Sequence, residues 1–216
     1  MRTVPAIVAA LVRKSAFLEE GLGLGLINHS ALARLIKPDV EREAMKDVGE
    51  GAVIVALNRL SHRVRGRVRR TRSIFRKTPD LIVRLNLFEV TYANSESLFR
   101  RQKTLIESPG VRAPFFLAFT RGINETTIIA SRELRERVLR VCRGERRVSE
   151  IGRLASVTVL LPHGTALIPG VYSYILKALA WEGLNVVEVV STLDDFAIIL
   201  EDKNVSAAFS VIKRLF

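Results

Sequence analysis

The chain has 216 residues, a formal net charge of +12 and an isoelectric point near 10.6, with 48% hydrophobic and 26% charged residues. This composition is typical of a packed globular protein and excludes a disordered tail, a collagen-like fibre and a low-complexity linker. The one cysteine, Cys142, excludes an internal disulfide framework and a multi-cysteine zinc site, and it fits a reducing compartment.

The first apolar run, Val4 to Val12, has the spacing of an amphipathic helix. It stops at Arg13 and Lys14 without a small-residue cleavage site, and it is shorter than the roughly 20 apolar residues that span a bilayer. We therefore expect a cytoplasmic protein in which this segment packs as a helix on its neighbours.

The sequence up to residue 63 continues in a helical pattern. Gly21, Gly23 and Gly25 are expected to interrupt it, and Asn28 or Ser30 to cap a short helix over Ala31–Ile36. Lys37 and Pro38 are expected to end that helix, before a polar helix near Asp39–Lys46 and a further helix over Ala52–Leu60. The segments 30–36 and 52–60 resemble the two helices of a helix-turn-helix motif, although their connection is longer than the usual turn.

A strongly basic segment follows, because residues 61–77 hold eight arginine and lysine side chains and no acid. Guanidinium groups suit phosphates, so the segment is a candidate nucleic-acid contact. An arginine-rich solvated linker explains it equally well. The candidate nucleic-acid-binding residues are Arg59, Arg63, Arg65, Arg67, Arg69, Arg70 and Arg72.

From residue 80 onward one pattern of strands and helices occurs twice. Residues 125–129 align with 195–199 at an offset of 70, and residues 88–91 align with 157–160 at an offset of 69. Each copy predicts the order strand, helix, strand, strand, helix, which is a ferredoxin-like α+β arrangement. Near Leu87 and Phe88 the alternation slips, which predicts a bulge or a strand buried on both faces.

The expected fold is therefore α+β, with an N-terminal helical domain over residues 1–79 and two βαββα units over residues 80–150 and 151–216. The second unit has no residues left for a fourth strand. We expect its sheet to be completed by the other unit or by another chain.

The second unit resembles an ACT domain of the aspartokinase type. The resemblance depends on the strand Ser156–Leu161, the sequence Pro169–Gly170–Val171, Leu184–Val186 and Ser191–Thr192. The first unit resembles a degenerate ACT unit, because Ala93–Asn94–Ser95 stands where the family has Pro-Gly. The whole chain is similar to archaeal ACT-domain proteins related to aspartokinases, although it has no kinase domain.

The ACT resemblance implies a module that senses a small molecule, usually an amino acid, and that pairs sheet edges with another copy. In this family the effector binds where the loop after the first strand meets the following helix, and backbone amides at a helix start suit a carboxylate. The implied ligand-binding residues are His163, Gly164, Pro169, Gly170, Val171 and Asn185. The alternative is that Pro169–Gly170 begins a helix without binding a ligand, because some ACT units only oligomerise.

The sequence offers no arrangement of residues that predicts an enzyme, a metal site or a cofactor. His29, His62 and His163 are far apart and lack acidic or cysteine neighbours at ligand spacing. Asp194–Asp195 fits a hairpin turn, and Cys142 falls on the apolar face of a helix. The glycines at 21, 23 and 25 lack the strand and the spacing of a dinucleotide loop.

Two functions remain open. The first is a regulator that binds DNA through its basic N-terminal domain and senses an amino acid through its ACT pair, as a homodimer or larger homo-oligomer. The second is an amino-acid-binding protein that modulates a metabolic enzyme without binding nucleic acid. The charge favours a polyanion contact in the first part, because residues 1–80 carry +8, residues 81–150 carry +5 and residues 151–216 carry −1.

Overall fold

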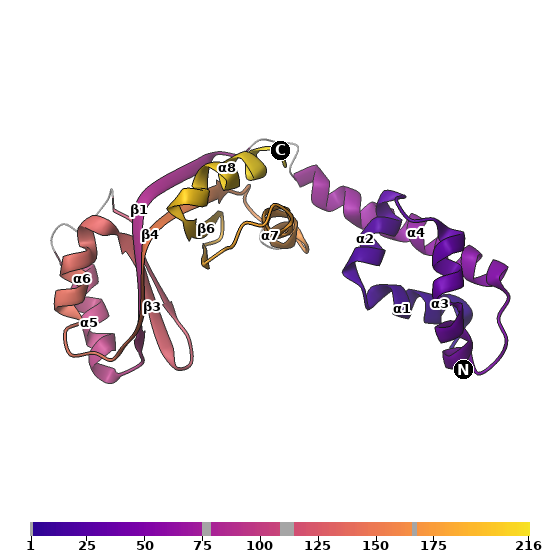
Figure 1. Ribbon diagram of the computed structural model, residues 1–216, viewed down its shortest axis with the longest axis horizontal. Coiled ribbons are helices and arrows are strands. Elements are labelled where there is room, and N and C mark those ends of the chain that lie inside the picture. Colours follow the sequence, from indigo (N-terminus) through magenta and orange to yellow (C-terminus); the bar gives the residue numbers. More distant parts are fainter. Residues whose placement is uncertain (1, 75–78, 109–114, 166–167) are drawn as a thin grey trace. The chain divides into compact units, whose positions relative to one another are not determined.

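The computed structural model (Figure 1) describes residues 2–74, 79–108, 115–165 and 168–216, and for residues 67–74 it describes the backbone alone. The chain divides into two compact units, Met1–Arg76 and Lys77–Phe216. The first unit contains helices, and the second combines helices with one antiparallel sheet. Among the described residues, no helix is both long enough and apolar enough to span a membrane.

The helical unit consists of α1 (Val4–Arg13), α2 (Ala16–Leu24), α3 (His29–Ala44) and α4 (Glu50–Ile74). The predicted N-terminal helix is confirmed, and its side chains Ile7, Val8 and Val12 are fully buried in the core of this unit. The helix α4 contacts each of the other three, and its buried face includes Val53, Leu57, Leu60 and Val64. This one long helix is the support on which the other three pack.

Two of the expected helix boundaries are wrong. Gly21 and Gly23 lie buried inside α2, and an added Cβ at Gly21 would stand 2.8 Å from Cδ1 of Ile27, so this glycine permits close packing. Only Gly25 ends the helix, with a left-handed φ of 75°. Pro38 lies inside α3 because tertiary burial of this 16-residue helix outweighs the one backbone hydrogen bond that proline cannot donate.

The basic segment is not an extended linker. Its backbone continues α4, which runs for 25 residues through both the segment 52–60 and most of the arginine run. The expected short helix over 31–36 is likewise part of the longer α3. The two segments expected to form the helix-turn-helix motif are therefore parts of the longer helices α3 and α4, and the motif stays a prediction.

The second unit contains the predicted repeat. The first copy is formed by β1 (Leu81–Ala93), α5 (Glu96–Glu107), β2 (Leu117–Arg121), β3 (Glu125–Ser131) and α6 (Arg135–Val141). The second copy is formed by β4 (Arg147–Leu160), α7 (Val171–Trp181), β5 (Glu188–Ser191), β6 (Asp195–Glu201) and α8 (Val205–Lys213). Short 3-10 turns, η1 (Arg132–Leu134) and η3 (Asp202–Asn204), precede the last helix of each copy.

The six strands form one antiparallel sheet in the order β2-β3-β1-β4-β6-β5. The central strands β1 and β4 have 13 and 14 residues, and each takes part in both copies. The first half of β1 pairs with the second half of β4, from Leu81 opposite Val159 to Arg84 opposite Ser156. The expectation that the second copy's sheet is completed by the other copy is confirmed, and the expected boundary between residues 150 and 151 falls inside β4.

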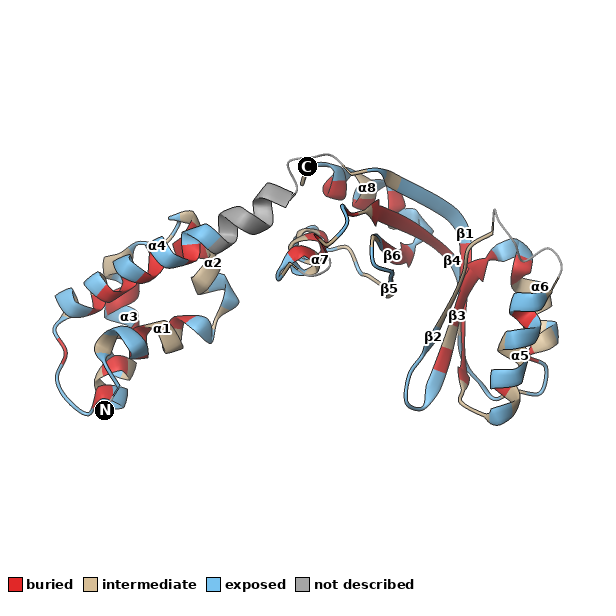
Figure 2. Cartoon of the chain, turned by 180° about the vertical axis from the view of Figure 1, so that it is seen from behind, coloured by how far each residue is buried: buried red, intermediate tan, exposed pale blue. Residues whose placement is uncertain are grey.

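The two long strands change direction at matching bulges. Their register shifts between Arg84 and Leu87, and Asn86 and Arg153 have left-handed φ angles of 57° and 55°. Beyond the bulge β1 is buried on both faces from Leu87 to Tyr92, so both alternatives predicted for this segment occur together. Figure 2 shows β1 changing from exposed to buried along its length.

The sheet has a hydrophobic core on each face of the first copy. Phe88, Val90 and Tyr92 pack with Leu98 and Leu105 of α5, with Val138 of α6 and with Cys142, which caps the end of α6. The opposite face holds a smaller cluster with one residue from each of the four central strands: Leu87, Ile129, Leu154 and Ile199. This second cluster joins the two copies.

Candidate functional site

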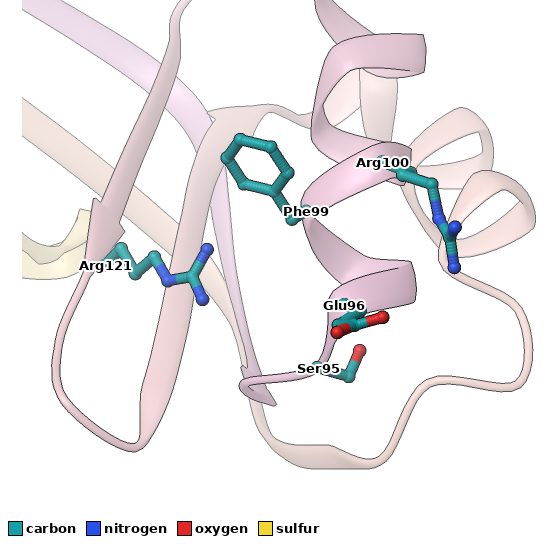
Figure 3. Close-up of a pocket in the computed structure, with 5 residues that line it drawn as sticks. All are labelled: Ser95, Glu96, Phe99, Arg100 and Arg121. Carbon is teal, nitrogen blue, oxygen red and sulfur yellow. The ribbon is translucent and has the colours of Figure 1, made fainter.

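A pocket of about 470 Å³ lies at the start of α5, in the first copy of the repeat. Four lining residues, Ser95, Glu96, Phe99 and Arg100, come from the beginning of this helix, and Arg121 comes from the end of β2. Figure 3 shows the side chains of Arg121 and Phe99 directed toward one another, while Arg100 points away from Arg121. The Arg121 guanidinium lies 5.7 Å from the centre of the Phe99 ring, within range of a cation–π contact.

Asn94 joins the two elements that form this pocket. Its side-chain amide donates hydrogen bonds to the carbonyl oxygens of Gly122 (2.9 Å) and Ile123 (3.1 Å) in the β2–β3 turn. Its side-chain oxygen accepts a 2.6 Å hydrogen bond from Oγ1 of Thr126. Because Asn94 directly precedes the N-cap of α5, these bonds hold the hairpin and therefore Arg121 beside the helix start.

A carboxylate of the protein itself stabilises the start of α5. Oγ of Ser95 accepts the backbone N–H of Leu98 (2.9 Å) as the helix cap and donates to Oε2 of Glu145 (2.7 Å). Nε of Arg101 lies 2.7 Å from the other oxygen of Glu145, whose side chain is only 5% exposed. Glu145 thus accepts the hydroxyl of Ser95. The pocket lining has two cations, Arg100 and Arg121, of which Arg121 is the one directed toward Phe99.

The pKa of Glu145 reflects opposed influences. Burial by itself raises the pKa, but hydrogen bonds from Ser95 and Ser97 and the charge of Arg101 together bring it below the ordinary value of 4.5. The ionised carboxylate is therefore the form that the folded protein stabilises.

The predicted ligand residues of the second copy come from two segments of the chain, one before α7 and one after it. Pro169 and Gly170 are exposed at the start of α7, with Gly170 at φ 93° as its N-cap, and the adjacent Val171 is buried. Asn185 lies four residues beyond the last residue of this eleven-residue helix, in the segment before β5.

His163 and Gly164 lie earlier in the same long loop. His163 is exposed, and its Nδ1 is 3.4 Å from Oδ1 of Asp194 in the β5–β6 turn. Gly164 has a left-handed φ of 82°. The loop between Leu161 and α7 includes residues 166–167, which lie outside the described residues, so the ligand set predicted for this copy stays a prediction.

The two copies differ mainly in this loop. A backbone hydrogen bond from Asn94 to Asn124 (2.8 Å) has its counterpart in one from Leu161 to Asp194 (2.7 Å). In the first copy the helix cap, Ser95, follows at once, whereas nine residues separate Leu161 from α7 in the second. Pro-Gly in the sequence points to the second copy, whereas no spacing in the sequence indicates Asn94, Glu96, Phe99 and Arg121 of the pocket at α5. The cap residue Ser95 in the degenerate loop was the available signal.

The candidate nucleic-acid residues are only partly described. Arg59, Arg63 and Arg65 are exposed on α4, outside its buried face. Arg59 and Arg63 are one turn apart, whereas Arg65 lies about 200° around the helix axis from Arg63. Arg67, Arg69, Arg70 and Arg72 belong to the same helix, but their side chains lie outside the described part of the chain.

The predicted core role of Cys142 is confirmed. Its side chain is buried beside Val138 and Leu134, and burial raises the pKa of the thiol to about 11, so the nucleophilic thiolate is disfavoured. Within the described ranges, no group of three or more histidine, cysteine or acidic side chains could hold a metal ion.

The fold is similar to that of aspartate kinase regulatory regions. No family model and no curated protein matches the sequence. Among solved structures, the regulatory subunit of aspartate kinase from Thermus thermophilus has a TM-score of 0.54 at 13% identity, covering 65% of this chain and 99% of that subunit. Clostridium acetobutylicum aspartate kinase has a TM-score of 0.53 at 13% identity, covering 63% of this chain and 34% of the enzyme.

Aspartokinase III of E. coli, in complex with aspartate and ADP, has a TM-score of 0.50 at 12% identity, covering 65% of this chain and 34% of the enzyme. The Thermus protein is matched over nearly its whole length and is a regulatory subunit, so the likeness is to a regulatory fold and not to a catalytic one. At these identities the comparison shows the fold, and the fold expected from the ACT resemblance is supported.

Changing Glu145 to Gln should lower the melting temperature at pH 7, because the pKa of Glu145 is lower in the folded than in the unfolded chain. The ionised carboxylate stabilises the fold above the unfolded value of about 4.5, and this contribution disappears as the pH falls through the lower folded-state value. Thermal unfolding from pH 7 to pH 3 measures the difference. Glu107→Gln, at an exposed carboxyl, is the control, and an E145Q deficit that does not shrink at low pH would contradict the assignment.

Proposed function

We propose that the chain is a regulatory protein whose second unit senses a free amino acid in the pocket at the start of α5. The observation that carries this proposal is the presence of opposite charges in one pocket lining, where Glu96 at the helix start and Arg121 on β2 accompany the exposed ring of Phe99. A free amino acid has an ammonium group for the carboxylate and a carboxylate for the guanidinium. The apolar ring offers a contact for the side chain of the amino acid.

The likeness of the fold to that of the Thermus regulatory subunit supports a sensing role. In this proposal the sensor acts on a partner or on the helical unit by favouring one of two conformations. The loop of the second copy, with His163, Gly164, Pro169, Gly170, Val171 and Asn185, is a second candidate site for the same class of ligand.

Calorimetric titration of the intact chain with the twenty amino acids tests the pocket. We expect at least one to bind, and Arg121→Gln and Glu96→Gln each to weaken it tenfold or more, because each removes one charge partner of the zwitterion. Arg143→Gln and Glu107→Gln, at exposed positions elsewhere in the first copy, are the matched controls.

A third variant locates the site. If His163→Ala with Asn185→Ala abolishes binding while Arg121→Gln does not, the second copy holds the ligand and the pocket at α5 is the wrong site. If calorimetry detects no heat of binding with any of the twenty amino acids, the proposal that the second unit senses an amino acid is refuted.

We also propose that the protein assembles with a second copy through the first half of β1. Among the described residues, this half pairs only with β4, so one edge of it has no strand partner. Asp80 accepts a hydrogen bond from Leu160, so the even-numbered residues face β4 and the polar backbone of Leu81, Val83 and Leu85 faces the open edge. Open edges of this kind are templates for strand pairing.

One register favours self-association of this edge. Antiparallel pairing about Ile82 matches the outward-facing backbone groups of Leu81 and Val83 and places Asp80 of each copy opposite Arg84 of the other. Opposite charges across strands stabilise a pair by about 0.2–1 kcal/mol each. The side chains at 82, 83 and 85, which are 39%, 40% and 56% exposed, would be covered.

Sedimentation velocity of Ile82→Lys tests this interface. Two lysines would face one another at the symmetry axis, so we expect the dimer dissociation constant to rise at least tenfold. Ile123→Lys, at a turn residue that is 96% exposed, is the matched control and should leave association unchanged. A monomeric unchanged chain at micromolar concentration would refute edge pairing.

We retain binding of DNA by the helical unit as a second function of the regulator, and the observation that favours it is the exposed basic face of α4. Arg59 and Arg63 are one helical turn apart on that face. The alternative is a sensor that modulates a metabolic enzyme and does not bind nucleic acid.

Binding of duplex DNA at several salt concentrations distinguishes these functions. We expect Arg59→Ala with Arg63→Ala to weaken binding about tenfold and to reduce the slope of log K against log salt by about 2, as for two lost phosphate contacts. Arg13→Ala with Lys46→Ala removes two exposed charges elsewhere in the same unit and is the control. If the unchanged chain forms no complex at low salt, the enzyme-modulating function is favoured.

A further inference from the structure

A second pocket lies at the bulges of the two central strands, away from the start of α5. It has a volume of about 410 Å³ and is lined by residues from β1, from β4, and from η1 and α6: Leu87, Phe88, Arg132, Arg135, Glu136, Gly152 and Arg153. Its size is in the range of pockets that take small molecules. A smaller hollow, lined by Asn86, Arg132 and Glu133, shares Arg132 with it.

The lining of this pocket carries an excess of positive charge. Three guanidinium groups and one carboxylate line it. Arg135 is fixed in place, because its Nε donates to Oε1 of Glu150 (2.8 Å) and its Nη1 lies 3.0 Å from Oε1 of Glu136. Nη1 of Arg147 donates to the other oxygen of Glu150 at 2.6 Å. The positive charges of Arg135 and Arg147 are therefore balanced by the negative charges of Glu136 and Glu150.

Arg132 and Arg153 are the remaining cations. In the described part of the chain neither side chain forms a hydrogen bond or an ion pair, and both are exposed. Two arginines that line one pocket beside a third, fixed one match a group with two negative charges and several acceptor oxygens. The pocket at α5 has a smaller excess of positive charge, because two guanidinium groups and one carboxylate line it.

The backbone at Arg153 supports a role for its side chain. Arg153 adopts a left-handed conformation with φ 55°, although Gly152, which would adopt it without cost, is the preceding residue. Left-handed backbone at a side chain other than glycine, asparagine or aspartate is unfavourable and is retained where the surrounding structure imposes it. Here it belongs to a residue that lines the pocket.

We propose that this pocket binds the phosphate group of a small molecule, held between the guanidinium groups of Arg132 and Arg153, with Arg135 as a third donor. Glu150 acts through Arg135 and is a positioning residue. The protein then has a site for a phosphorylated ligand that is separate from the amino-acid pocket, and this proposal does not depend on that one.

Nitrogen–proton correlation spectra of the intact chain at low salt test the proposal, with inorganic phosphate and AMP as the two probes. We expect saturable shifts of the Gly152 amide and of Nε–H of Arg135 with at least one probe. Saturation by AMP alone identifies an organic phosphate as the ligand type, and equal saturation by both identifies the phosphate group itself as sufficient.

The variant Arg132→Gln with Arg153→Gln should weaken this binding at least tenfold. Arg140→Gln with Arg143→Gln, which removes two exposed charges from the same copy, should change it less than twofold. Arg153→Gly, which removes the guanidinium but accepts the left-handed backbone, should also lose binding while its melting temperature does not fall. The proposal is overturned if neither probe shifts Gly152, if the shifts are confined to α4, or if the control loses as much affinity as the Arg132 and Arg153 variant.

Discussion

The pairing of β1 with β4 is the constraint on which the second unit depends. Each strand is long enough to serve both copies of the repeat, so neither copy has a complete sheet without the other. At the crossing point Leu87 and Leu154 are opposite one another and fully buried, together with Ile129 and Ile199 from the adjacent strands. Loss of one large side chain from such a core costs about 2–5 kcal/mol, which indicates how strongly this small cluster joins the two copies.

Both proposed pockets take their positions from these two strands. The end of β1 places Asn94, and Asn94 fixes the hairpin that carries Arg121 beside α5. The bulge of β4 places Arg153, and the strand segment before it places Glu150, which holds Arg135. The pockets therefore lie at two points along one pair of strands, so a shift in their register would alter both.

The order of elements in the repeat could be predicted from sequence because it depends on local periodicity, as in α7, whose buried residues Val171, Ile175 and Leu179 recur at helical spacing. The first half of β4 was missed, since Arg147–Gly152 has polar and exposed residues and its pairing partner is 60 residues earlier in the chain. Pro38 and Gly21 gave wrong helix boundaries because burial in the helical core overrides local preference. The pocket at α5 was missed since its parts, Asn94 and Arg121, meet only through a hairpin contact that spacing does not encode.

Sharing of the central strands also sets an order for folding during synthesis. The strand segment that completes the first copy, Arg147–Ile151, is made about 60 residues after the β1 segment with which it pairs, so the growing chain holds β1 with one side unpaired for that interval. Non-local strand pairing of this kind is slow because the loop must close before the contacts form, and unpaired edges expose the chain to association with its neighbours.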